Sequence, residues 1–404
     1  MKTKSLIPKL HILIDVFFEE MRIVYCIIDS SRSGGMERSI CCKANYLADV
    51  AGYEVTIITT DRKGKPNFYD YSSAIQFIDL DINYNESDSL SFFWRIRAQI
   101  KKRELHKERL TTTLFDISPD ICISTYTHEL SILSQIKDGS KKIAEIHFCR
   151  PYKKIQYELK SKFSLHRIFA LAAEKRKRKF IHNYDAFVVL TKEDRERWKG
   201  ITKIECIPNP LPFYTDRVNN DSSKQIISVG RLAYEKGYPM LIGAWAKIAH
   251  KYPDWKLAIV GEGEDKPLLQ RLIFQKDLMG SVSIHPPQEH IKEVYLDSSF
   301  YVMSSFYEGF GLVLTEAMAC GLPCVSFDCP SGPAEIIKHG EDGLLIATKD
   351  IAKLAEAMSL LIEDKEMRLE MSENAKINVK RFLPERIMPR WIALFEKITN
   401  TSNY

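Results

Sequence analysis

The sequence lacks any hydrophobic run long enough to cross a bilayer, which requires about 20 consecutive apolar residues. Its longest apolar stretches are short and are bounded like buried strands. It also lacks internal repeats and low-complexity tracts, and apolar residues make up 45% of the 404. Disordered and fibrous classes are therefore excluded, and a chain of this length is expected to form two globular domains.

Cysteine does not occur in the even, regularly spaced pattern of a disulfide framework. Nine cysteines are scattered along the chain, mostly inside apolar runs, which indicates reduced core thiols. Cys320, Cys324 and Cys329 cluster, but no histidine lies at the spacing of a zinc ligand. We expect no structural metal ion at this cluster.

A secretory signal peptide is not expected either. The first 20 residues place basic residues before a short apolar run, but Asp15 interrupts that run and a small-residue cleavage site is missing. Met21 opens the first convincing strand and is a second candidate start of translation. We expect residues 1–20 to be a dispensable extension and the protein to be cytoplasmic.

Short β-branched runs alternate with helical patterns along the whole chain. They occupy residues 22–29, 55–60, 120–125, 142–148 and 186–191 in the first half, and residues 225–230, 256–261, 282–285, 300–305, 323–328 and 343–346 in the second. Continuous apolar runs between helices are typical of parallel sheets that are covered on both faces. The pattern predicts an α/β protein with two facing doubly wound, Rossmann-like domains.

Three prolines in residues 207–213 forbid a helix there and indicate an extended linker that acts as a hinge. We place the N-terminal domain at residues 1–206 and the C-terminal domain at residues 207–384. The closing segment is predicted to be helical, with an apolar stripe over residues 381–398. Ligands bind beyond the carboxyl ends of parallel strands, so the cleft between two such domains is the expected site.

Two groups of charged residues follow predicted strands of the second half. Arg231 and Lys236 lie on the loop after residues 225–230, and a guanidinium with a mobile ammonium suits a pyrophosphate. Glu308 precedes a helix expected to begin near Leu312, and Glu316 lies about one turn inside it. Carboxylates accept hydrogen bonds from sugar hydroxyls, although each residue alone is also compatible with an ordinary surface charge.

Four blocks of the second half occur in a recognisable order, namely GRL-x3-KG, VGEGED, EGFG-x4-EA and PSGPAEII with DGLL. This order resembles the retaining, two-domain GT-B glycosyltransferases of family 4, group 1, such as the GalNAc- and glucosyl-transferring enzymes of bacterial polysaccharide synthesis. The C-terminal half resembles the family almost from end to end. The N-terminal half matches weakly, through the two glycines of SRSGGMER and the general strand order.

The resemblance implies a role for each of these residues. Arg231 and Lys236 would hold the donor diphosphate, Glu308 the hydroxyls of the donor sugar, and Glu316 the ribose. Backbone contacts to sugar and phosphates would come from Phe310, Gly311 and Leu312. The last helix, residues 385–404, would cross back to cover the N-terminal domain.

The resemblance also leaves the nucleobase uncertain. The family often has a glycine after the third strand of its C-terminal domain, near the base. This chain has IHPPQ at residues 284–288, with His285 as the nearest candidate contact. Uridine is the default expectation.

In the first half, Gly34 and Gly35 join the first predicted strand to its helix and could present amide groups to a phosphate, or merely form a tight turn. His147 ends a predicted strand, and the family often places a histidine there beneath the reacting sugar carbon. A histidine can exchange a proton with a hydroxyl near neutral pH. A structural histidine is the alternative, and His128 is the rival candidate.

Asp79 and Asp81 imitate the Asp-x-Asp metal motif of single-domain glycosyltransferases, but they lie far along the sequence from every donor motif. Arg231, Lys236 and a helix dipole can neutralise a leaving diphosphate without a cation. We therefore expect neither a metal requirement nor a cofactor besides the nucleotide-sugar substrate.

Positive charge is concentrated in the first half. Residues 1–206 carry a net charge of +9 and residues 207–404 a net charge of −4. The densest basic clusters are residues 94–110, 150–162 and 174–179, with aromatic residues among them. This composition suits an anionic membrane surface or a solvated helix face, whereas no recognition motif for nucleic acid accompanies it.

These features predict a hexosyltransferase that uses a nucleoside diphosphate sugar, with UDP-sugar as the default, and an acceptor hydroxyl on a glycan or a polyprenyl-linked sugar. The family resemblance implies retention at the anomeric carbon. We expect a peripheral association with the inner face of the plasma membrane. The alternatives are a nucleotide-sugar epimerase on the same fold and a non-catalytic protein that binds glycans or lipids.

Overall fold

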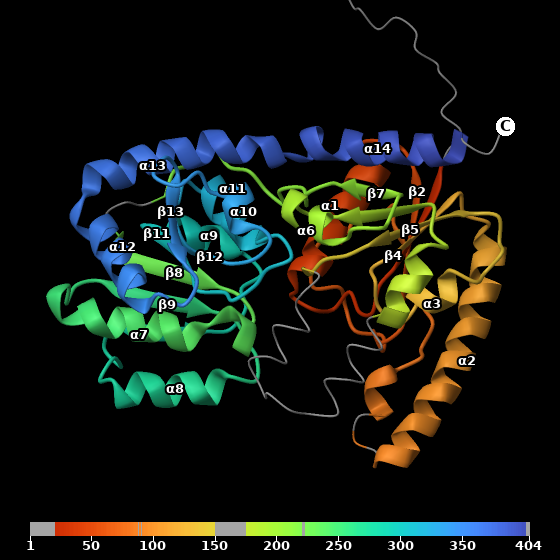
Figure 1. Ribbon diagram of the computed structural model, residues 1–404, viewed down its shortest axis with the longest axis horizontal. Coiled ribbons are helices and arrows are strands. Elements are labelled where there is room, and N and C mark those ends of the chain that lie inside the picture. Colours follow the sequence, from red (N-terminus) through yellow and green to blue (C-terminus); the bar gives the residue numbers. More distant parts are fainter. Residues whose placement is uncertain (1–20, 88, 90, 150–174, 220–222, 401–404) are drawn as a thin grey trace, which may run out of the picture.

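The computed structural model describes residues 21–87, 89, 91–149, 175–219 and 223–400. The expected extension at residues 1–20, the basic cluster at residues 150–162 and the last four residues lie outside this description. The described residues form two α/β halves that lie side by side, each built on one parallel sheet (Figure 1).

The first half is a seven-stranded parallel sheet of order β3-β2-β1-β4-β5-β6-β7. Its strands are β1 Arg22–Cys26, β2 Glu54–Thr59, β3 Gln76–Asp79, β4 Ile121–Ser124, β5 Lys141–Glu145, β6 Ala186–Val189 and β7 Ile204–Cys206. Its helices are α1 Gly35–Asp49, η1 Tyr84–Ser87, α2 Phe92–Ile117, α3 Leu130–Leu133 and α6 Lys192–Arg197. Helix α1 shares an apolar cluster with one face of the sheet, and α2 and α3 share a second cluster with the other.

The second half is a six-stranded parallel sheet of order β10-β9-β8-β11-β12-β13. Its strands are β8 Gln225–Val229, β9 Lys256–Val260, β10 Val282–His285, β11 Phe300–Met303, β12 Cys324–Asp328 and β13 Gly343–Ala347. Its helices are η3 Tyr234–Lys236, α7 Tyr238–Ile248, η4 Ala249–Lys251, α8 Lys266–Gln275, α9 Ile291–Leu296, α10 Leu312–Ala319, α11 Pro333–Ile336, α12 Ile351–Glu363, α13 Lys365–Asn378 and η5 Val379–Phe382. Two doubly wound sheets confirm the predicted fold class.

Strands β3 and β7 are not among the strands predicted from the sequence. Both are short edge strands, and their residues are half-buried or exposed. Their sequences, QFID in β3 and IEC in β7, do not form the apolar run of β-branched residues that predicts the other strands.

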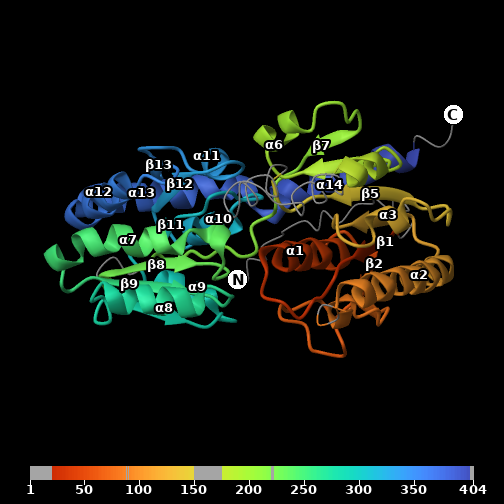
Figure 2. The same ribbon diagram turned by 60° about the horizontal axis from the view of Figure 1, so that its bottom comes forward.

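The last helix, α14 Pro384–Asn400, lies against α1 of the first half (Figures 1 and 2). Trp391 and Phe395 of α14 are fully buried in the apolar cluster that α1 shares with the first sheet. Lys397 adds an ion pair with Glu205 of β7, at 2.8 Å. Helix α14 thus packs on the half that contains β1 and α1.

The linker at residues 207–213 is packed against both halves. Asn209 is buried and its Oδ1 accepts a hydrogen bond from Ser39 Oγ of α1, at 2.7 Å. The Leu211 amide donates to the carbonyl of Phe382, also at 2.7 Å. The linker is therefore an extended segment with fixed contacts at both ends.

The nine cysteines, all of which lie in the described residues, are free thiols. Seven of them are buried, and burial raises the pKa of the Cys122 thiol to about 11. A buried, neutral thiol behaves as a small apolar side chain. This agrees with the expectation of reduced core thiols.

Candidate active site

The loops after β8 and β11 bring two of the predicted donor residues together. Lys236 Nζ lies 2.7 Å from Glu308 Oε1, and Ser305 Oγ donates a hydrogen bond to the same oxygen at 2.6 Å. The side chains of Lys236 and Glu308 are 20% and 10% exposed. A nearly buried carboxylate is thus fixed by a cation and a hydroxyl, with one edge accessible.

The two loops approach each other closely because Gly237 separates them. Gly237 has a φ of 62°, and a Cβ there would lie 2.1 Å from the carbonyl oxygen of Ser304. Ser304 Oγ donates in turn to the carbonyl of Lys236 at 2.8 Å. A side chain at this position would push Lys236 away from Glu308, so glycine is required for the ion pair.

Arg231 lies at the surface of the same loop. Its guanidinium pairs with Glu235, and 65% of its side chain is exposed. It therefore presents a planar group with hydrogen-bond donors to solvent at the carboxyl end of β8. The structure places Arg231 and Lys236 on one loop, as the sequence predicted.

His147 follows β5 of the first half and has two charged neighbours. Its Nε2 lies 3.3 Å from Glu145 Oε1, and the same carboxylate forms a buried ion pair with Lys43 of α1. Burial opposes ionisation of Glu145, but Lys43 and His147 outweigh it and lower the pKa of this carboxyl to about 2. Lys43 Nζ also lies 4.8 Å from the ring centre of Trp391 in α14.

The imidazole of His147 is 4% exposed, and neither of its nitrogens has an aligned hydrogen bond within the described residues. Its contact with Glu145 is electrostatic, without hydrogen-bond alignment. Because a buried polar atom normally has a partner, this ring is suited to accept or donate to a ligand.

The two halves meet at His147 and Gly309. A Cβ at Gly309 would lie 1.9 Å from the carbonyl oxygen of His147 and 2.9 Å from the Cα of Phe148. Only glycine permits this approach of two backbones. The segment that carries Glu308 thus abuts the segment that carries His147.

Glu316 lies deeper, on α10. It is 2% exposed, its Oε2 accepts a hydrogen bond from Tyr295 at 3.0 Å, and its Oε1 lies 3.2 Å from Arg38 NH1 of α1. The pKa of this carboxyl is raised, because the effect of burial outweighs the opposite effects of Arg38 and Tyr295. The carboxylate is therefore bound from both halves of the molecule.

The glycines of the first loop lie at the start of α1. Gly34 takes the N-cap position, Gly35 opens the helix, and a Cβ on Gly35 would meet no atom within 4 Å. Glu37 in the first turn is buried, and burial raises its pKa to about 7. The space beside Gly35 and the positive end of α1 are compatible with the predicted phosphate contact.

The remaining predicted donor residues differ in exposure. Phe310 is buried edge-on against Phe382, so only its backbone is available to a ligand. Gly311 is the N-cap of α10, with a φ of 94°, and Leu312 opens the helix, where the sequence predicted it to begin. His285 ends β10 and is exposed, with Nε2 2.8 Å from Ser283 Oγ.

His128 belongs to a separate aromatic group. It stacks on Tyr84 of η1 with ring centres 4.2 Å apart, and Tyr84 shares a hydrogen bond of 3.0 Å with His106 of α2. Burial lowers the pKa of His106 to about 4, so that residue is neutral at physiological pH. His128 also borders a surface cavity beside α2, of about 350 Å³.

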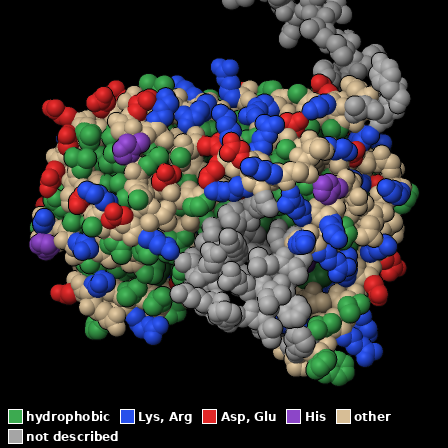
Figure 3. All heavy atoms as spheres, in the orientation of Figure 1, with side chains coloured by type: hydrophobic (Ala, Val, Ile, Leu, Met, Phe, Trp, Pro, Cys, Tyr) green, Lys and Arg blue, Asp and Glu red, His purple; other side chains and the backbone are tan. Residues whose placement is uncertain are grey.

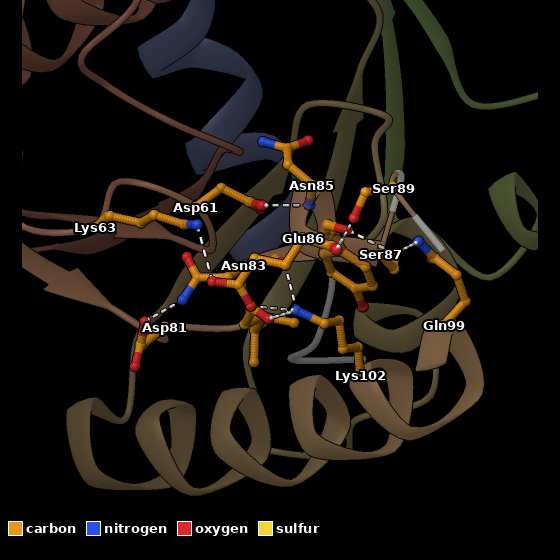
Figure 4. A network of polar contacts seen from close by, with 12 residues as sticks. Asp61, Lys63, Asp81, Asn83, Asn85, Glu86, Ser87, Ser89, Gln99 and Lys102 are labelled. Atoms are coloured by element: carbon orange, nitrogen blue, oxygen red, sulfur yellow. Dashed lines mark hydrogen bonds and ion pairs between the residues drawn. The ribbon is translucent and has the colours of Figure 1, made fainter. Parts of the chain in front are cut away.

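Asp79 and Asp81 take part in the packing of the first half. Asp79 Oδ1 accepts from Thr59 Oγ1 at 3.0 Å, and Asp81 accepts from Asn83 in the network of Figure 4. In the same network Lys102 of α2 contacts Glu86 at 3.1 Å and the backbone of residues 82 and 83. Within the described ranges, no three His, Cys, Asp or Glu side chains converge in a way that could hold a metal ion.

Sequence reasoning missed several residues of this site, namely Arg38, Lys43, Glu145 and Tyr295. Glu145 gave a signal, because it is a charged residue inside the otherwise apolar run KIAEIHF. Lys43 similarly interrupts the apolar face of α1. Which acid pairs with which base depends on the packing of α1 on β5, which the sequence does not specify.

No helix in the described part of the chain has the length and hydropathy of a membrane span. Facing parallel sheets with cationic and acidic loops at their carboxyl ends form the architecture of a two-domain GT-B glycosyltransferase. Comparison with known proteins makes the assignment specific. The family described as Glycosyl transferases group 1 matches residues 215–378, and Glycosyltransferase Family 4 matches residues 33–212.

An uncharacterized glycosyltransferase of Haemophilus influenzae is 30% identical over 377 residues, which are 92% of this chain and 98% of the relative. The chain therefore belongs to the group 1 and family 4 glycosyltransferases. A Campylobacter jejuni α-1,4-N-acetyl-D-galactosaminyltransferase, named for an undecaprenol diphosphate-linked acceptor, is 28% identical over 223 residues, 54% of this chain and 61% of that protein.

Solved structures show the same fold at low identity. TarM of S. aureus, in a complex with Fondaparinux, alpha-GlcNAc-glycerol and UDP, has a TM-score of 0.75 at 16% identity and covers 93% of this chain and 99% of its own. Sucrose-phosphate synthase of Thermosynechococcus elongatus has a TM-score of 0.77 at 18% identity, with 94% and 100% covered. The two-domain GT-B architecture is thereby established.

Proposed function

We propose that this glycosyltransferase moves a hexose-type sugar from a UDP-sugar to an acceptor hydroxyl, with retention at the anomeric carbon, in the synthesis of a bacterial-type cell-surface polysaccharide or lipid-linked glycan. The bond between the anomeric carbon and the diphosphate oxygen breaks, and a bond from the acceptor oxygen to that carbon forms. The acceptor hydroxyl gives its proton to the departing diphosphate oxygen, which keeps the electron pair of the broken bond, and the nucleoside diphosphate leaves.

The observation that carries this proposal is the contact between Gly309 and His147, which brings the Lys236–Glu308 pair to the first half of the molecule. A donor held by Lys236 and Glu308 would place its sugar at the boundary of the two halves. An acceptor bound on the first half could then reach the anomeric carbon.

Stabilisation of the leaving diphosphate is the main catalytic device in this proposal. Lys236 and the exposed guanidinium of Arg231 would offset the charge that develops on the diphosphate oxygen. We propose that the reaction needs no metal ion, because these two cations and the N-terminal end of α10 supply positive potential. Glu308 would orient the sugar through its hydroxyls.

His147 would contact the sugar from the opposite side. The buried carboxylate of Glu145 lies beside its ring, with Oε1 3.3 Å from Nε2. A ring held in this way can donate a hydrogen bond to a sugar hydroxyl or stabilise positive charge indirectly through Glu145. Lys43 fixes the carboxylate and prevents it from rotating away.

We also propose that the acceptor is carried on an anionic membrane, on its cytoplasmic face. Helix α2 supports this, because its exposed side chains include Phe93 at 82% and Trp94 at 64%, next to exposed Arg95 and Arg97. Figure 3 shows Lys and Arg side chains over the N-terminal half, on the right. Aromatic residues among cations are typical of membrane-surface helices.

The test is a screen of nucleotide sugars for donor hydrolysis without acceptor, with and without EDTA, in the wild-type protein and in Glu308→Gln. A UDP-sugar that is hydrolysed with an unchanged rate in EDTA, and much more slowly by Glu308→Gln, is the expected result. If no nucleotide sugar is hydrolysed and no nucleoside diphosphate binds in calorimetry, the proposed activity is wrong.

A further inference from the structure

Arg38 of the first half forms an ion pair with Glu316, a buried acidic residue of the second half. It lies in the second turn of α1, and its guanidinium stands over the rings of Tyr69 and Phe213, 5.3 and 5.2 Å from their centres. Its NH1 lies 3.2 Å from Glu316 Oε1, with side-chain exposures of 17% and 3%. Two aromatic rings and a carboxylate thus fix the position of the guanidinium.

These contacts join four separate segments. Arg38 comes from α1, Tyr69 precedes β3, Phe213 ends the linker, and Glu316 belongs to α10 of the second half. The ion pair therefore exists only while the two halves and the linker keep this arrangement.

Glu316 depends on Arg38 for its charge. A carboxyl group that is 2% exposed is shifted toward its neutral form unless a cation or hydrogen bonds compensate. Tyr295 supplies one hydrogen bond, and Arg38 is the one cation in contact with this carboxylate within the described residues. Without Arg38, Glu316 would bind a proton at a higher pH than it does now.

The charge on Glu316 affects how well this residue can bind the ribose that the site is expected to hold. The 2′ and 3′ hydroxyls of a ribose donate well to an ionised carboxylate and poorly to a protonated one, which has a single free acceptor oxygen. A donor site whose ribose contact is neutral would lose this part of its affinity.

We propose that Arg38 is a positioning residue of the donor site, which keeps Glu316 ionised and oriented so that its carboxylate accepts hydrogen bonds from the ribose hydroxyls. The inference rests on the proposed function, which assigns the ribose to Glu316. It adds that recognition of the ribose requires a residue of the N-terminal half. The donor site is then complete only when the two halves are in contact.

The groups that face Glu316 define its pH dependence. They are Arg38 of α1, Tyr295 of α9, Tyr69 before β3 and Cys320 at the end of α10. Burial raises the pKa of both tyrosines and raises that of Cys320 to about 12, so all three are neutral between pH 6 and 9. Without Arg38, only Glu316 in this group titrates over that range, and its negative charge increases as pH rises.

The experiment compares a nucleoside diphosphate with its 2′,3′-dideoxy form. Wild-type protein is titrated with UDP, GDP and ADP by calorimetry, and the best ligand and its dideoxy analogue are then measured from pH 6 to pH 9. Hydrogen bonds to a charged acceptor predict that the ribose form binds roughly tenfold more tightly or better, at every pH. This ratio of affinities is the readout.

In Arg38→Met the ratio should be lowest at pH 6, well below that of the wild type, and should increase with pH, because the negative charge on Glu316 increases. Arg38→Lys should restore the ratio at low pH in large part. In Glu316→Gln the ratio should be close to one at every pH. Arg197→Met is the matched control, since it removes another contact between the halves, to Ser331 at 2.8 Å, without touching Glu316.

Arg197→Met should change both affinities by the same factor and leave the ratio at its wild-type value. A wild-type ratio in Arg38→Met at all pH values would overturn the inference. The inference would also be overturned if the ratio in Arg38→Met stays at one up to pH 9 while the near-UV circular dichroism of this variant is native. If Arg38→Met does not fold, a low and pH-independent ratio in folded Arg38→Lys overturns it equally. Absence of binding of any nucleoside diphosphate to wild-type protein would instead refute the proposed function.

Discussion

At the scale of single residues, substitution of Arg231 and substitution of Lys236 would have different effects on the fold. Arg231 is 65% exposed, whereas Lys236 holds a Glu308 side chain that is 10% exposed. Removing Lys236 would leave a nearly buried carboxylate without its cation and would disturb the fold as well as the chemistry. Arg231 is therefore the cleaner probe of diphosphate stabilisation.

We expect Arg231→Ala to lower turnover by ~10²-fold, because a preorganised electrostatic contact of the transition state is lost. Its unfolding free energy should change by less than about 0.5 kcal/mol, as for other exposed charges. Lys224→Ala is the matched control, since it removes an exposed pair with Asp254 just before the same strand, β8. Near-normal turnover in Arg231→Ala would remove this residue from the donor site.

Lys43 and Glu145 form a fully buried ion pair. Removal of one charge from such a pair destabilises the fold more than removal of both, because it leaves the other charge buried and unpaired. We expect Glu145→Gln and Lys43→Met each to lose about 3–5 kcal/mol of unfolding free energy, and the double variant to lose less than the two together. Denaturant unfolding of all three variants measures this coupling. Additive losses would mean that the pair contributes no mutual stabilisation.

The same pair predicts a dependence of stability on pH. The pKa of Glu145 is lowered from 4.5 to about 2, so its stabilising contribution is fully present above about pH 4.5 and is lost as pH falls toward 2. Urea unfolding between pH 2 and 6 should show this loss in wild-type protein, and the Lys43→Met/Glu145→Gln variant should show a smaller one. An equal loss in both proteins would contradict the assignment.

For His147, a role at the reacting sugar and a structural role predict different results. If the imidazole contacts the sugar, His147→Ala should lower transfer and acceptor-free hydrolysis together and leave nucleoside diphosphate affinity unchanged. If the residue is structural, activity should fall only with the fraction of folded protein. Melting temperature, UDP affinity and turnover of one preparation distinguish the two. Unchanged turnover in a folded variant would make His128 the next residue to test.

At the scale of secondary-structure elements, α2 is divided into a packed side and a solvent-facing side. Lys102 is engaged with Glu86 and the backbone of residues 82 and 83 (Figure 4), whereas Arg97 and Lys101 are exposed. A charge-reversing substitution of Lys102 would therefore break its contacts with η1. Reduced membrane binding of such a variant could then result from a change in structure and not from the loss of charge. Only the exposed cations are suitable for a test of membrane association.

We expect the double variant Arg97→Glu/Lys101→Glu to lose most of its binding to vesicles that contain anionic lipid, because each basic side chain near such a surface contributes about 1 kcal/mol. Donor hydrolysis should be unaffected. Lys251→Glu/Lys276→Glu, in the second half, is the charge-matched control. If sedimentation of the wild-type protein shows no preference for anionic over neutral vesicles, the membrane proposal fails.

The elements also show what the sequence can and cannot specify. The central strands were predictable because parallel strands covered on both faces are continuous apolar runs. The helix that begins at Leu312 was predictable from the glycines before it. The edge strands β3 and β7 were not, and neither were the Arg38–Glu316 and Lys43–Glu145 pairs. Such pairs join positions more than 100 residues apart, and only the packing of helices on sheets brings them together.

At the scale of the whole molecule, the two halves are joined by few polar contacts outside the site. Helix α6 of the first half holds the segment before α11 of the second. Glu193 Oε2 accepts from the Ser331 amide at 2.6 Å, and the Glu193 amide donates to Glu335 Oε1 at 3.0 Å. Arg197 donates to Ser331 Oγ at 2.8 Å. By contrast, α14 is held on the first half by buried apolar residues.

This difference suggests that the α6 contacts separate more readily than those of α14 and the linker. Apolar contacts of α14 are extensive, whereas hydrogen bonds at a wet interface contribute about 1 kcal/mol each. Domain motion is the ordinary expectation for two halves with a limited polar interface. Opening would separate Gly309 from His147 and Arg38 from Glu316 at the same time.

We therefore expect Glu193→Ala/Arg197→Ala to shift the protein toward an open state. Its radius of gyration in small-angle scattering should exceed that of the wild type without ligand, and saturating UDP should bring the two values together. Because closure must then be driven by the ligand, UDP affinity should fall by several-fold, while turnover at saturating donor is nearly retained. The variant Lys338→Ala, whose side chain contacts Glu341 and Asn378 within the second half, should leave both measurements unchanged. A radius that does not change in the α6 variant, together with reduced UDP affinity, would mean that these contacts shape the site directly instead of controlling its closure.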